Sequence, residues 1–393
     1  MRALGLLLVS GRLRPLLWTP VVVSVLWAVV FGAGRPAAAS SSAQNRLQAL
    51  WDAFVRTYVL DSGAVVDPMR QGRVSSEAQS YALVRAVWMR DRKTFDRVLD
   101  WTKRHLRRED GLHAWSWDPK TSRVDDPNCA TDGDVEIAFA LAMASVAFDH
   151  PPYALQARDI VRAIRLHASI PVGERWFPSA GNWAGPERII NLSYFYPYAT
   201  PWFERLDPGA GWAEATTLGY ELVEATLAAG PASLPADFAV LRPDGRLAAL
   251  PSDHSLSAAF SYDSIRVPWR LDLACRLTRD RRACRLAETF GRRLAAMQGR
   301  DGGFVTRYDA ITGLPTNSER SQSFAGAFLT VLLRAAPEVA RRVRAEQFDD
   351  ASLDGLGRAS DRYYEANWVW FGLAAADGLI EARTPSVERL VVP

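Results

Sequence analysis

Glu77, Asp132 and Asp263 are acidic residues that each stand at the predicted beginning of a helix. Ser75 and Ser76 ahead of Glu77 are typical N-cap residues, and apolar residues then recur at helical spacing. Rigidly held carboxyl groups can donate and accept protons, so a cluster of them would carry out acid–base chemistry. Taken alone, each acid is better explained as a first-turn residue that complements the helix dipole. The repetition of this setting in three places favours a shared site.

The composition is that of a soluble globular protein with many aromatic residues. The chain has 393 residues, of which 48% are hydrophobic and 23% are charged, and its formal net charge is +3. Basic residues are interspersed with acids, so we expect no binding of nucleic acid. The five histidines and three cysteines are too few and too scattered for a zinc site, and we expect no metal and no cofactor. The 14 tryptophans and 11 tyrosines can fill a core or line a groove for sugars.

The N-terminal segment has the pattern of an export signal. Arg2, Arg12 and Arg14 precede an uncharged run over residues 16–33, and Ala37-Ala38-Ala39 then offers a cleavage site of the A-x-A type. The run is also close to the lower limit of about 18 residues for a membrane span, so an uncleaved membrane anchor is the alternative. The upstream arginines favour a cytoplasmic N-terminus in both cases. The body of the protein is therefore expected outside the cytoplasm, as a periplasmic, secreted or membrane-anchored domain.

Apolar residues recur at the helical period along most of the remaining chain, which predicts helices joined in pairs by short charged turns. The predicted helices span residues 47–58, 77–89, 95–106, 132–142, 153–167, 211–229, 262–275, 281–297, 323–333, 337–346 and 362–376. A long aromatic loop is expected over 169–208 and a short hairpin over 239–251. We therefore expect residues 1–43 to be a signal peptide or anchor with a spacer, and residues 44–393 to form a single all-α domain. A ring of such helix pairs would bring the three acids to one face.

Four segments match motifs that occur in the same order in one known family. Ser76-Glu77-Ala78-Gln79-Ser80-Tyr81 is similar to S-E-G-x-G-Y, and the segment from Ala130 to Ala138 is similar to A-T/S-D-A/G-D-x-x-I-A. The segment from Asn191 to Phe195 is similar to N-P-S-Y-F, and that from Tyr262 to Arg270 is similar to Y-D-A-x-R-x-P-x-R. These motifs are those of glycoside hydrolase family 8, which the chain resembles from Gln44 to Ala376.

The resemblance implies an (α/α)6 barrel, a toroid of helical hairpins with long aromatic loops over a cleft, that hydrolyses β-1,4-linked glycans with inversion. It assigns Glu77 as the general acid and Asp263 as the general base. Asp132 would contact the sugar at the point of cleavage. Tyr194 would help to hold the attacking water, and Arg266 would pair with nearby carboxylates. The implied partner is a β-linked polysaccharide, bound by a monomeric enzyme.

Aromatic side chains near these motifs are further candidates for binding the sugar chain. They are Tyr81, Trp115, Trp117 and Trp183. Each of the three tryptophans is explained as well by packing in the core as by a role as a platform for sugars.

Two of the acidic assignments have alternatives in the sequence. Asp134 is a second acid in the same motif, and it would be the functional one if Asp132 were only an N-cap. Asp263 would be an ordinary ion-pair partner if it served only to bind Arg266 or Arg270. The motif position favours Asp132 and Asp263 in both cases.

The chemistry of glycoside cleavage sets conditions on the pKa values of these acids. One carboxyl must be protonated and another ionised, and in an inverting enzyme the two stand about 6.5–9.5 Å apart, which leaves room for a water. A helix N-terminus lowers the pKa of a carboxyl, so Glu77 needs an opposing influence. A carboxylate such as Asp132 nearby, together with burial, would supply it. Asp263 is expected to stay ionised at its own helix start.

The sequence departs from the family pattern at four positions. Ala78, Ser80 and Ala82 stand where glycines are usual, and Leu192 replaces a proline. The added methyl groups would tighten the contact with a sugar or with a neighbouring helix, while all three carboxyls are retained.

The leading interpretation is an inverting endo-β-1,4-glycanase, most simply an endoglucanase that acts on cellulose-like chains and is linked to exopolysaccharide synthesis. A first alternative is a weakly active or inactive glycan-binding protein of an envelope polysaccharide assembly system. A second is a family 8 chitosanase or xylanase. Turnover on a panel of β-glycans separates these interpretations.

The cysteines allow one disulfide. Cys275 and Cys284 lie nine positions apart on either side of a predicted helix turn, and in an exported protein they can face each other across it. Two separate buried thiols are the alternative. Cys129 is expected to be a small buried hydrophobic residue.

Overall fold

The computed structural model describes residues 41–393, which lie in one compact unit. Almost all of the predicted leader, residues 1–43, lies outside the described residues. Fourteen α-helices dominate the described part of the chain, which confirms the all-α fold class. Among residues 41–393, no helix combines the length and the apolar character needed to cross a membrane.

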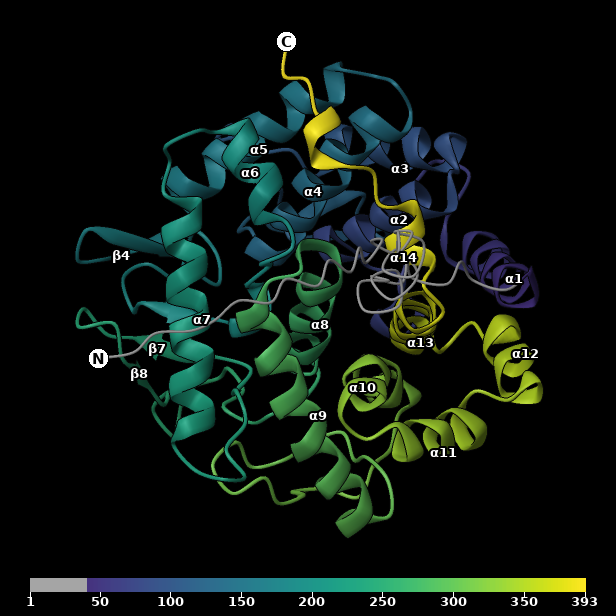
Figure 1. Ribbon diagram of the computed structural model, residues 1–393. Helices are drawn as coiled ribbons and strands as arrows, with labels where there is room; N and C mark the ends of the chain where they lie inside the picture. Colours follow the sequence, from purple (N-terminus) through teal and green to yellow (C-terminus); the bar gives the residue numbers. More distant parts are fainter. Residues whose placement is uncertain (1–40) are drawn as a thin grey trace, which may run out of the picture. The chain divides into compact units, whose positions relative to one another are not determined.

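Five long helices form most of an inner layer (Figure 1). They are α2 (Ser76–Met89), α4 (Thr131–Ala147), α8 (Arg266–Thr278), α10 (Gln322–Ala335) and α13 (Tyr363–Ala376). In α4 every residue except the last is buried. A helix surrounded by protein has no polar face, and the run from Ala138 to Met143, with no charged residue, meets that requirement.

Amphipathic helices form an outer layer around these five (Figure 1). They are α1 (Ser41–Tyr58), α3 (Arg92–His105), α5 (Pro152–His167), α7 (Trp212–Ala228), α9 (Arg281–Asp301), α11 (Pro337–Gln347) and α12 (Asp350–Arg358). The inner helices α2, α4, α8 and α10 each pack on the outer helix that follows them in the chain. The pairing of helices predicted from the sequence is thereby confirmed.

Two features complete the ring of inner helices. Between α4 and α8 the inner position is taken by the 3-10 turn η2 (Leu192–Tyr194), which contacts both helices, and by the short helix α6 (Thr200–Leu206). Between α13 and α2 the ring is closed by aromatic contacts, in which Tyr81 lies edge-on to Trp368 and Phe371 with centroids 5.9 and 5.3 Å apart. The result is the (α/α)6 barrel that the sequence predicts.

Glycine allows α10 and α13 to approach closely. A Cβ atom added to Gly372 would lie 2.2 Å from the carbonyl oxygen of Gly326, and one added to Gly326 would lie 2.4 Å from that of Trp368. Neither backbone can yield without moving its helix. The two glycines therefore set the distance between these inner helices.

Short strands connect the helices at several places. The strands are β1 (Val74–Ser75), β2 (Ser116–Asp118), β3 (Arg123–Asp126), β4 (Ser169–Val172), β5 (Arg175–Pro178), β6 (Ile189–Ile190), β7 (Ala239–Leu241) and β8 (Leu247–Ala248). They form three small antiparallel sheets, in the orders β1-β2-β3, β4-β5 and β6-β7-β8. The hairpin predicted over residues 239–251 is confirmed as β7–β8.

The aromatic loop region expected over residues 169–208 contains several short elements that the sequence did not predict. This region holds the β4–β5 hairpin, β6, η2 and α6. The helices α12 and α14 (Leu379–Arg383) and the 3-10 turns η1 (Pro68–Arg70) and η3 (Val387–Arg389) were also not predicted. Elements of two to nine residues are too short to show a clear hydrophobic period, so the sequence pattern does not reveal them.

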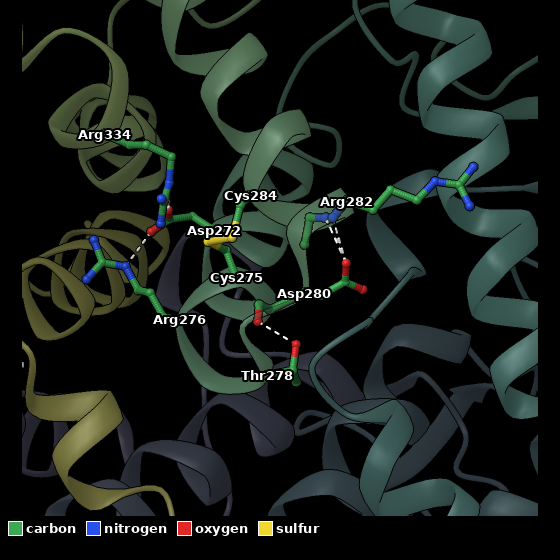
Figure 2. The surroundings of a disulfide bond; sticks show 10 residues. Asp272, Cys275, Arg276, Thr278, Asp280, Arg282, Cys284 and Arg334 are labelled. Carbon is green, nitrogen blue, oxygen red and sulfur yellow. Dashed lines mark hydrogen bonds and ion pairs between the residues drawn. A yellow bond between two sulfur atoms is a disulfide. The ribbon is translucent and has the colours of Figure 1, made fainter. Parts of the chain in front are cut away.

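Cys275 and Cys284 form a disulfide. Figure 2 shows the bond joining α8 to α9 across the turn that contains Thr278 and Asp280. The Cα atoms are 4.8 Å apart, a distance that a disulfide spans without movement of the backbone. Of the two possibilities that the sequence left open, the structure has the bridge, and Cys129 is the buried free cysteine.

A thiol count tests the bridge. We expect one free thiol, that of Cys129, when the protein is exported by its native host, unfolded without reductant and titrated with a chromogenic thiol reagent. The same titration after reduction should find three. A count of three before reduction would reject the disulfide.

Candidate active site

Glu77 and Asp132 occupy equivalent positions on neighbouring inner helices. Each is the second residue of its helix, Glu77 in α2 and Asp132 in α4. The predicted N-cap of α2 is confirmed, since the Ser75 hydroxyl accepts a 3.0 Å hydrogen bond from the backbone N–H of Ala78. The N-cap of α4 is Ala130, so Asp132 is not a cap. Both carboxyl groups therefore project from the N-terminal ends of rigid, packed helices.

Gly133 allows these two helix ends to meet. A Cβ atom at this position would lie 2.5 Å from the hydroxyl oxygen and 2.8 Å from the Cβ of Ser76. Ser76 is fully buried and cannot move aside. The absence of a side chain at Gly133 thus brings the residue before Glu77 into contact with the residue after Asp132.

The variant Gly133→Ala is expected to destabilise the protein by about 1–3 kcal/mol, the usual cost of overpacking, and to lower turnover because the two acids are pushed apart. Gly299→Ala is the matched control, because a Cβ at this helical glycine meets nothing within 4 Å. We expect the control to be neutral or slightly stabilising. Thermal unfolding and turnover measured on both variants check this, and equal behaviour of the two would contradict the close-contact argument.

Asp263 does not stand at a helix start, which corrects the expectation from the sequence. Helix α8 begins at Arg266, and Asp263 lies three residues earlier in a turn. Its carbonyl oxygen accepts hydrogen bonds from the backbone N–H of Arg266 at 3.2 Å and from its Nε at 3.0 Å. The hydroxyls of Ser261 and Ser264 donate hydrogen bonds to the carboxylate of Asp237, and these contacts hold the turn in place ahead of the helix.

Arg266 lies between the three acids. Its Nη1 is 2.5 Å from Glu77 Oε2 and 2.9 Å from Asp132 Oδ2, and its Nη2 binds Asp263 Oδ1. The hydroxyl oxygen of Tyr81 lies 3.2 Å from Nη1. The Arg266 side chain is 1% exposed. The predicted pairing of Arg266 with the carboxylates is confirmed, and one buried guanidinium joins acids from separate parts of the chain, of which Glu77 lies 189 positions before Arg266.

Access to solvent differs among the acids. The side chains of Glu77 and Asp263 are 27% and 29% exposed, whereas that of Asp132 is 3% exposed. The ring of Tyr194 packs over the guanidinium, with its centroid 5.5 Å from Arg266 Cζ. A substrate arriving from solvent would therefore reach Glu77 and Asp263 first, with Asp132 beneath them.

Burial raises the pKa of Glu77 above its ordinary value. The charge of Arg266 opposes this rise, and the charge of Asp132 and a hydrogen bond with Asp132 reinforce it. The expectation that Asp132 would help to keep Glu77 protonated is thus supported by the direction of the shift. Three carboxyl groups around a single guanidinium carry an excess of negative charge, which a proton on Glu77 relieves.

Burial raises the pKa of Asp263 to about 7, against the opposing charge of Arg266. The charges of Asp237, Glu77 and Asp132 add to the rise. The sequence predicted that a helix N-terminus would keep Asp263 ionised. The helix N-terminus is absent, since α8 begins only at Arg266, and burial together with the acidic neighbours raises the pKa of Asp263 instead of lowering it.

The tryptophans take different positions. The ring of Trp115 is half-buried beneath the guanidinium of Arg70, and its carbonyl oxygen accepts a 3.1 Å hydrogen bond from the N–H of Ser76 at the start of α2. The side chain of Trp183 is 37% exposed. It follows Asn182, whose side chain binds the segment before α4. Both tryptophans therefore lie on segments next to the helix ends that carry the acids.

Trp117 packs in a separate apolar cluster. Its ring lies edge-on to Trp101 at 5.2 Å and to His105 at 5.8 Å, on the outer helix α3. These contacts match the core-packing alternative for Trp117, and a role in binding sugars stays a prediction.

The alternative acids are engaged elsewhere. The carboxylate of Asp134 is fully buried and accepts hydrogen bonds from the backbone N–H and the Nδ1 of His113, the latter at 2.7 Å. Arg270, the other possible partner of Asp263, instead lies 3.7 Å from Glu136 and binds the hydroxyl of Tyr196. The cluster around Arg266 therefore contains Asp132 rather than Asp134.

Two further residues lie near the acids and were not singled out in the sequence. Asp237 is buried and binds the turn that carries Asp263. Tyr364, on the first turn of α13, donates a hydrogen bond to the carbonyl oxygen of Tyr262, and burial raises its pKa, with Arg266 opposing the rise and the charges of Glu77 and Asp263 adding to it. The sequence around Asp263 does not indicate Asp237 or Tyr364 as neighbours, because these two residues come from other parts of the chain.

Metal binding has no support in the described part of the chain. Among residues 41–393, no group of three or more His, Cys, Asp and Glu is arranged to hold a metal ion.

The described residues form a double-layered (α/α)6 barrel in which three carboxyl groups meet around Arg266, and the family model that the chain matches is that of a glycoside hydrolase. Residues 21–377 match the model of glycosyl hydrolases family 8, and this chain belongs to that family. The resemblance found in the sequence motifs is thereby confirmed.

Known relatives agree with this membership. An endoglucanase of Escherichia coli K12 is 27% identical over 339 residues, which cover 82% of this chain and 85% of that protein. The crystal structure of an endo-1,4-D-glucanase from Vibrio fischeri has a TM-score of 0.71 and 24% identity, and covers 83% of this chain and 94% of its own. The structure of a β-1,3-1,4-glucanase from Paenibacillus sp. X4 has a TM-score of 0.74 and 22% identity, and the match covers 86% of this chain and 92% of that one. The two structures share the fold.

Proposed function

We propose that this protein is an exported, inverting endo-β-1,4-glucanase. The observation that supports it most directly is the buried Arg266, whose guanidinium binds Glu77, Asp132 and Asp263 at once. Membership of family 8 and the relatives named endoglucanases support the choice of substrate.

In this proposal Glu77 is the general acid. Its raised pKa favours the protonated form that a general acid needs, and its partly exposed carboxyl can donate that proton to the leaving oxygen. Asp132 lies beneath it, accepts a 2.8 Å hydrogen bond from the N–H of Gly133, and stabilises the protonated form of Glu77. Asp132 would contact the sugar from below at the point of cleavage.

Asp263 is the general base of the proposal, with Tyr194 as a partner for the attacking water. Glu77 and Asp263 bind different terminal nitrogens of Arg266, so the guanidinium holds their carboxyl groups apart. Inversion needs a gap between acid and base that accommodates a water molecule. An acid and a base in direct contact would leave no such gap.

Glucan with β-1,4 linkages is our first choice of substrate, and chitosan, xylan and mixed-linkage glucan are the alternatives. Tyr81, Trp115 and Trp183 are the proposed aromatic contacts of the sugar chain, together with Tyr194. The mixed-linkage alternative has a counterpart among the structures with the same fold, in the β-1,3-1,4-glucanase.

The alternative of an inactive glycan-binding protein was based on the departures from glycine in α2. Ser80 and Ala82 are fully buried and Ala78 is 1% exposed, and the Ser80 hydroxyl donates a 2.7 Å hydrogen bond to the carbonyl oxygen of Glu77. These side chains contact protein rather than open solvent. The observation favours a functional hydrolase over a site blocked by extra methyl groups.

Export is part of the proposal, either as a soluble protein or tethered through the N-terminal segment, and the enzyme would act as a monomer. The disulfide between Cys275 and Cys284 supports an oxidising compartment, since such bonds are rare in the cytosol of mesophiles. A link to exopolysaccharide synthesis would follow if the glycan cleaved is one that the host itself produces.

A substrate panel tests the proposed function. Soluble β-1,4-glucan, mixed-linkage glucan, xylan and chitosan are each incubated with the wild type, and the new reducing ends are counted. We expect the highest rate on β-1,4-glucan, with a rapid fall in viscosity because internal bonds are cut. Highest turnover on another glycan would move the assignment to that substrate, and no turnover on any of them would refute the hydrolase.

A further inference from the structure

The turn that carries Asp263 is held by one buried carboxylate from another part of the chain. Asp237 Oδ1 accepts hydrogen bonds from the N–H of Ser261 at 3.1 Å, from the N–H of Ser264 at 3.0 Å and from the Ser264 hydroxyl at 2.9 Å. Its Oδ2 accepts a hydrogen bond from the Ser261 hydroxyl. The turn is thus bound to Asp237 by both of its serines, on either side of Asp263.

Asp237 is itself fixed in place. The residue is 1% exposed, and its own backbone N–H donates a 2.7 Å hydrogen bond to the carbonyl oxygen of Ala259. The N–H of the next residue, Phe238, binds the carbonyl oxygen of Ser257, and β7 begins directly afterwards. A charge-assisted network with this many partners gives the turn a defined geometry where no regular helix does.

We propose that Asp237 is a positioning residue that holds the general base Asp263 in the orientation needed to accept a proton from water, and that it also sets the pH range in which Asp263 acts. This inference rests on the proposed function, since it assigns a role within the same reaction. It predicts two separable effects, one of geometry and one of charge.

Several charged or titratable groups face Asp263, and they decide the size of the charge effect. They are Arg266 on α8, Glu77 on α2, Asp132 on α4, Tyr194 on η2, Tyr364 on α13 and Asp237 itself. Arg266 lowers the pKa of Asp263, and Asp237 is the first of the acids that raise it. Removal of the charge of Asp237 therefore lowers the pKa of Asp263. The acidic limb of the pH profile should move toward lower pH, because the base stays ionised further down.

Three variants separate geometry from charge. Asp237→Asn keeps an oxygen that can accept from the turn but removes the charge, so it should shift the acidic limb down by roughly 1 pH unit, typical of losing one nearby charge. Ser264→Ala keeps the charge but removes the hydrogen bonds of the Ser264 hydroxyl with Asp237 and with the Ser261 backbone, so it should lower kcat with little change in that limb or in KM. Asp237→Ala removes both and should lower kcat by about 10²-fold or more, as expected when a general base is misplaced.

Asp244→Asn is the matched control for net charge. Asp244 lies on the exposed β7–β8 turn and accepts a 3.0 Å hydrogen bond from the N–H of Arg246. The control removes the same charge from the same part of the chain, so it should leave kcat and the pH profile at wild-type values. An unshifted acidic limb in Asp237→Asn, or wild-type kcat in Asp237→Ala, would overturn the proposal.

An NMR titration keeps the inference testable apart from activity. The side-chain carboxyl of Asp263 is followed in protein labelled with ¹³C at aspartate, and its signal is identified by its loss in Asp263→Asn. We expect this signal to titrate at lower pH in Asp237→Asn than in the wild type. A wild type without turnover on any glycan would refute the proposed function, while an unchanged titration would refute the role of Asp237.

Discussion

Replacement of Glu77 by Gln is expected to lower kcat on unactivated β-1,4-glucan by about 10²–10⁴-fold, the usual contribution of a general acid. Glutamine has nearly the same shape and can still accept a hydrogen bond from Arg266 Nη1, now 2.5 Å from the carboxylate oxygen. It has no proton to give to the leaving oxygen. Binding of cello-oligosaccharides, measured by calorimetry, should remain because the sugar contacts are unchanged.

The choice of leaving group sharpens this test. An aryl glycoside with a good leaving group needs little protonation, so Glu77→Gln should recover much of its rate on such a substrate. Glu214→Gln is the matched control, because Glu214 also lies in the first turn of a helix, the outer helix α7, and is exposed. The control should have wild-type activity. Near-wild-type turnover of unactivated glucan by Glu77→Gln would remove the acid assignment.

Replacement of Asp263 by Asn is expected to cause a loss of similar size, about 10²–10⁴-fold in kcat, for a different reason. Inversion proceeds in one displacement, and the base must take a proton from the water that attacks opposite the leaving group. Asn keeps the shape of Asp263 but cannot accept that proton. A better leaving group should therefore not rescue Asp263→Asn, which distinguishes it from Glu77→Gln.

The stereochemistry of the product tests the mechanism directly. NMR of sugar freshly released by the wild type from a β-linked substrate should show the α-anomer first. Early appearance of the β-anomer would mean retention, and it would remove the base role of Asp263.

The pH dependence follows from the shift on Asp263. Its pKa of about 7 means that the carboxyl becomes protonated as the pH falls through neutrality in the free protein. The protonated form cannot accept a proton from water, so kcat/KM should decline on the acidic side of this value. A rate that stays constant well below pH 7 would show that another group is the base.

Much of the helical framework and part of the site were determined by local patterns in the sequence. Ser75 ahead of an apolar helix is sufficient to predict the start of α2, and the turn with Asp280 is sufficient to predict the boundary between α8 and α9. Such signals involve residues a few positions apart, whose interactions need no other part of the chain. The motifs also pointed to Glu77 and Asp132, and each is the second residue of its helix, α2 and α4 respectively.

Tertiary structure alone decided how Asp263 is held and charged. The sequence placed it at a helix start, yet contacts with Asp237, 26 positions earlier, keep it in a turn and help to raise its pKa. The bridge formed by Arg266 likewise depends on α2, α4 and α8 meeting at one end of the barrel. Electrostatic energies depend on distance in space and on exclusion of water, and neither is set by separation along the chain. The sequence therefore predicts which acids are candidates for the site, but their burial, their ion pairs and their pKa values depend on how the helices pack.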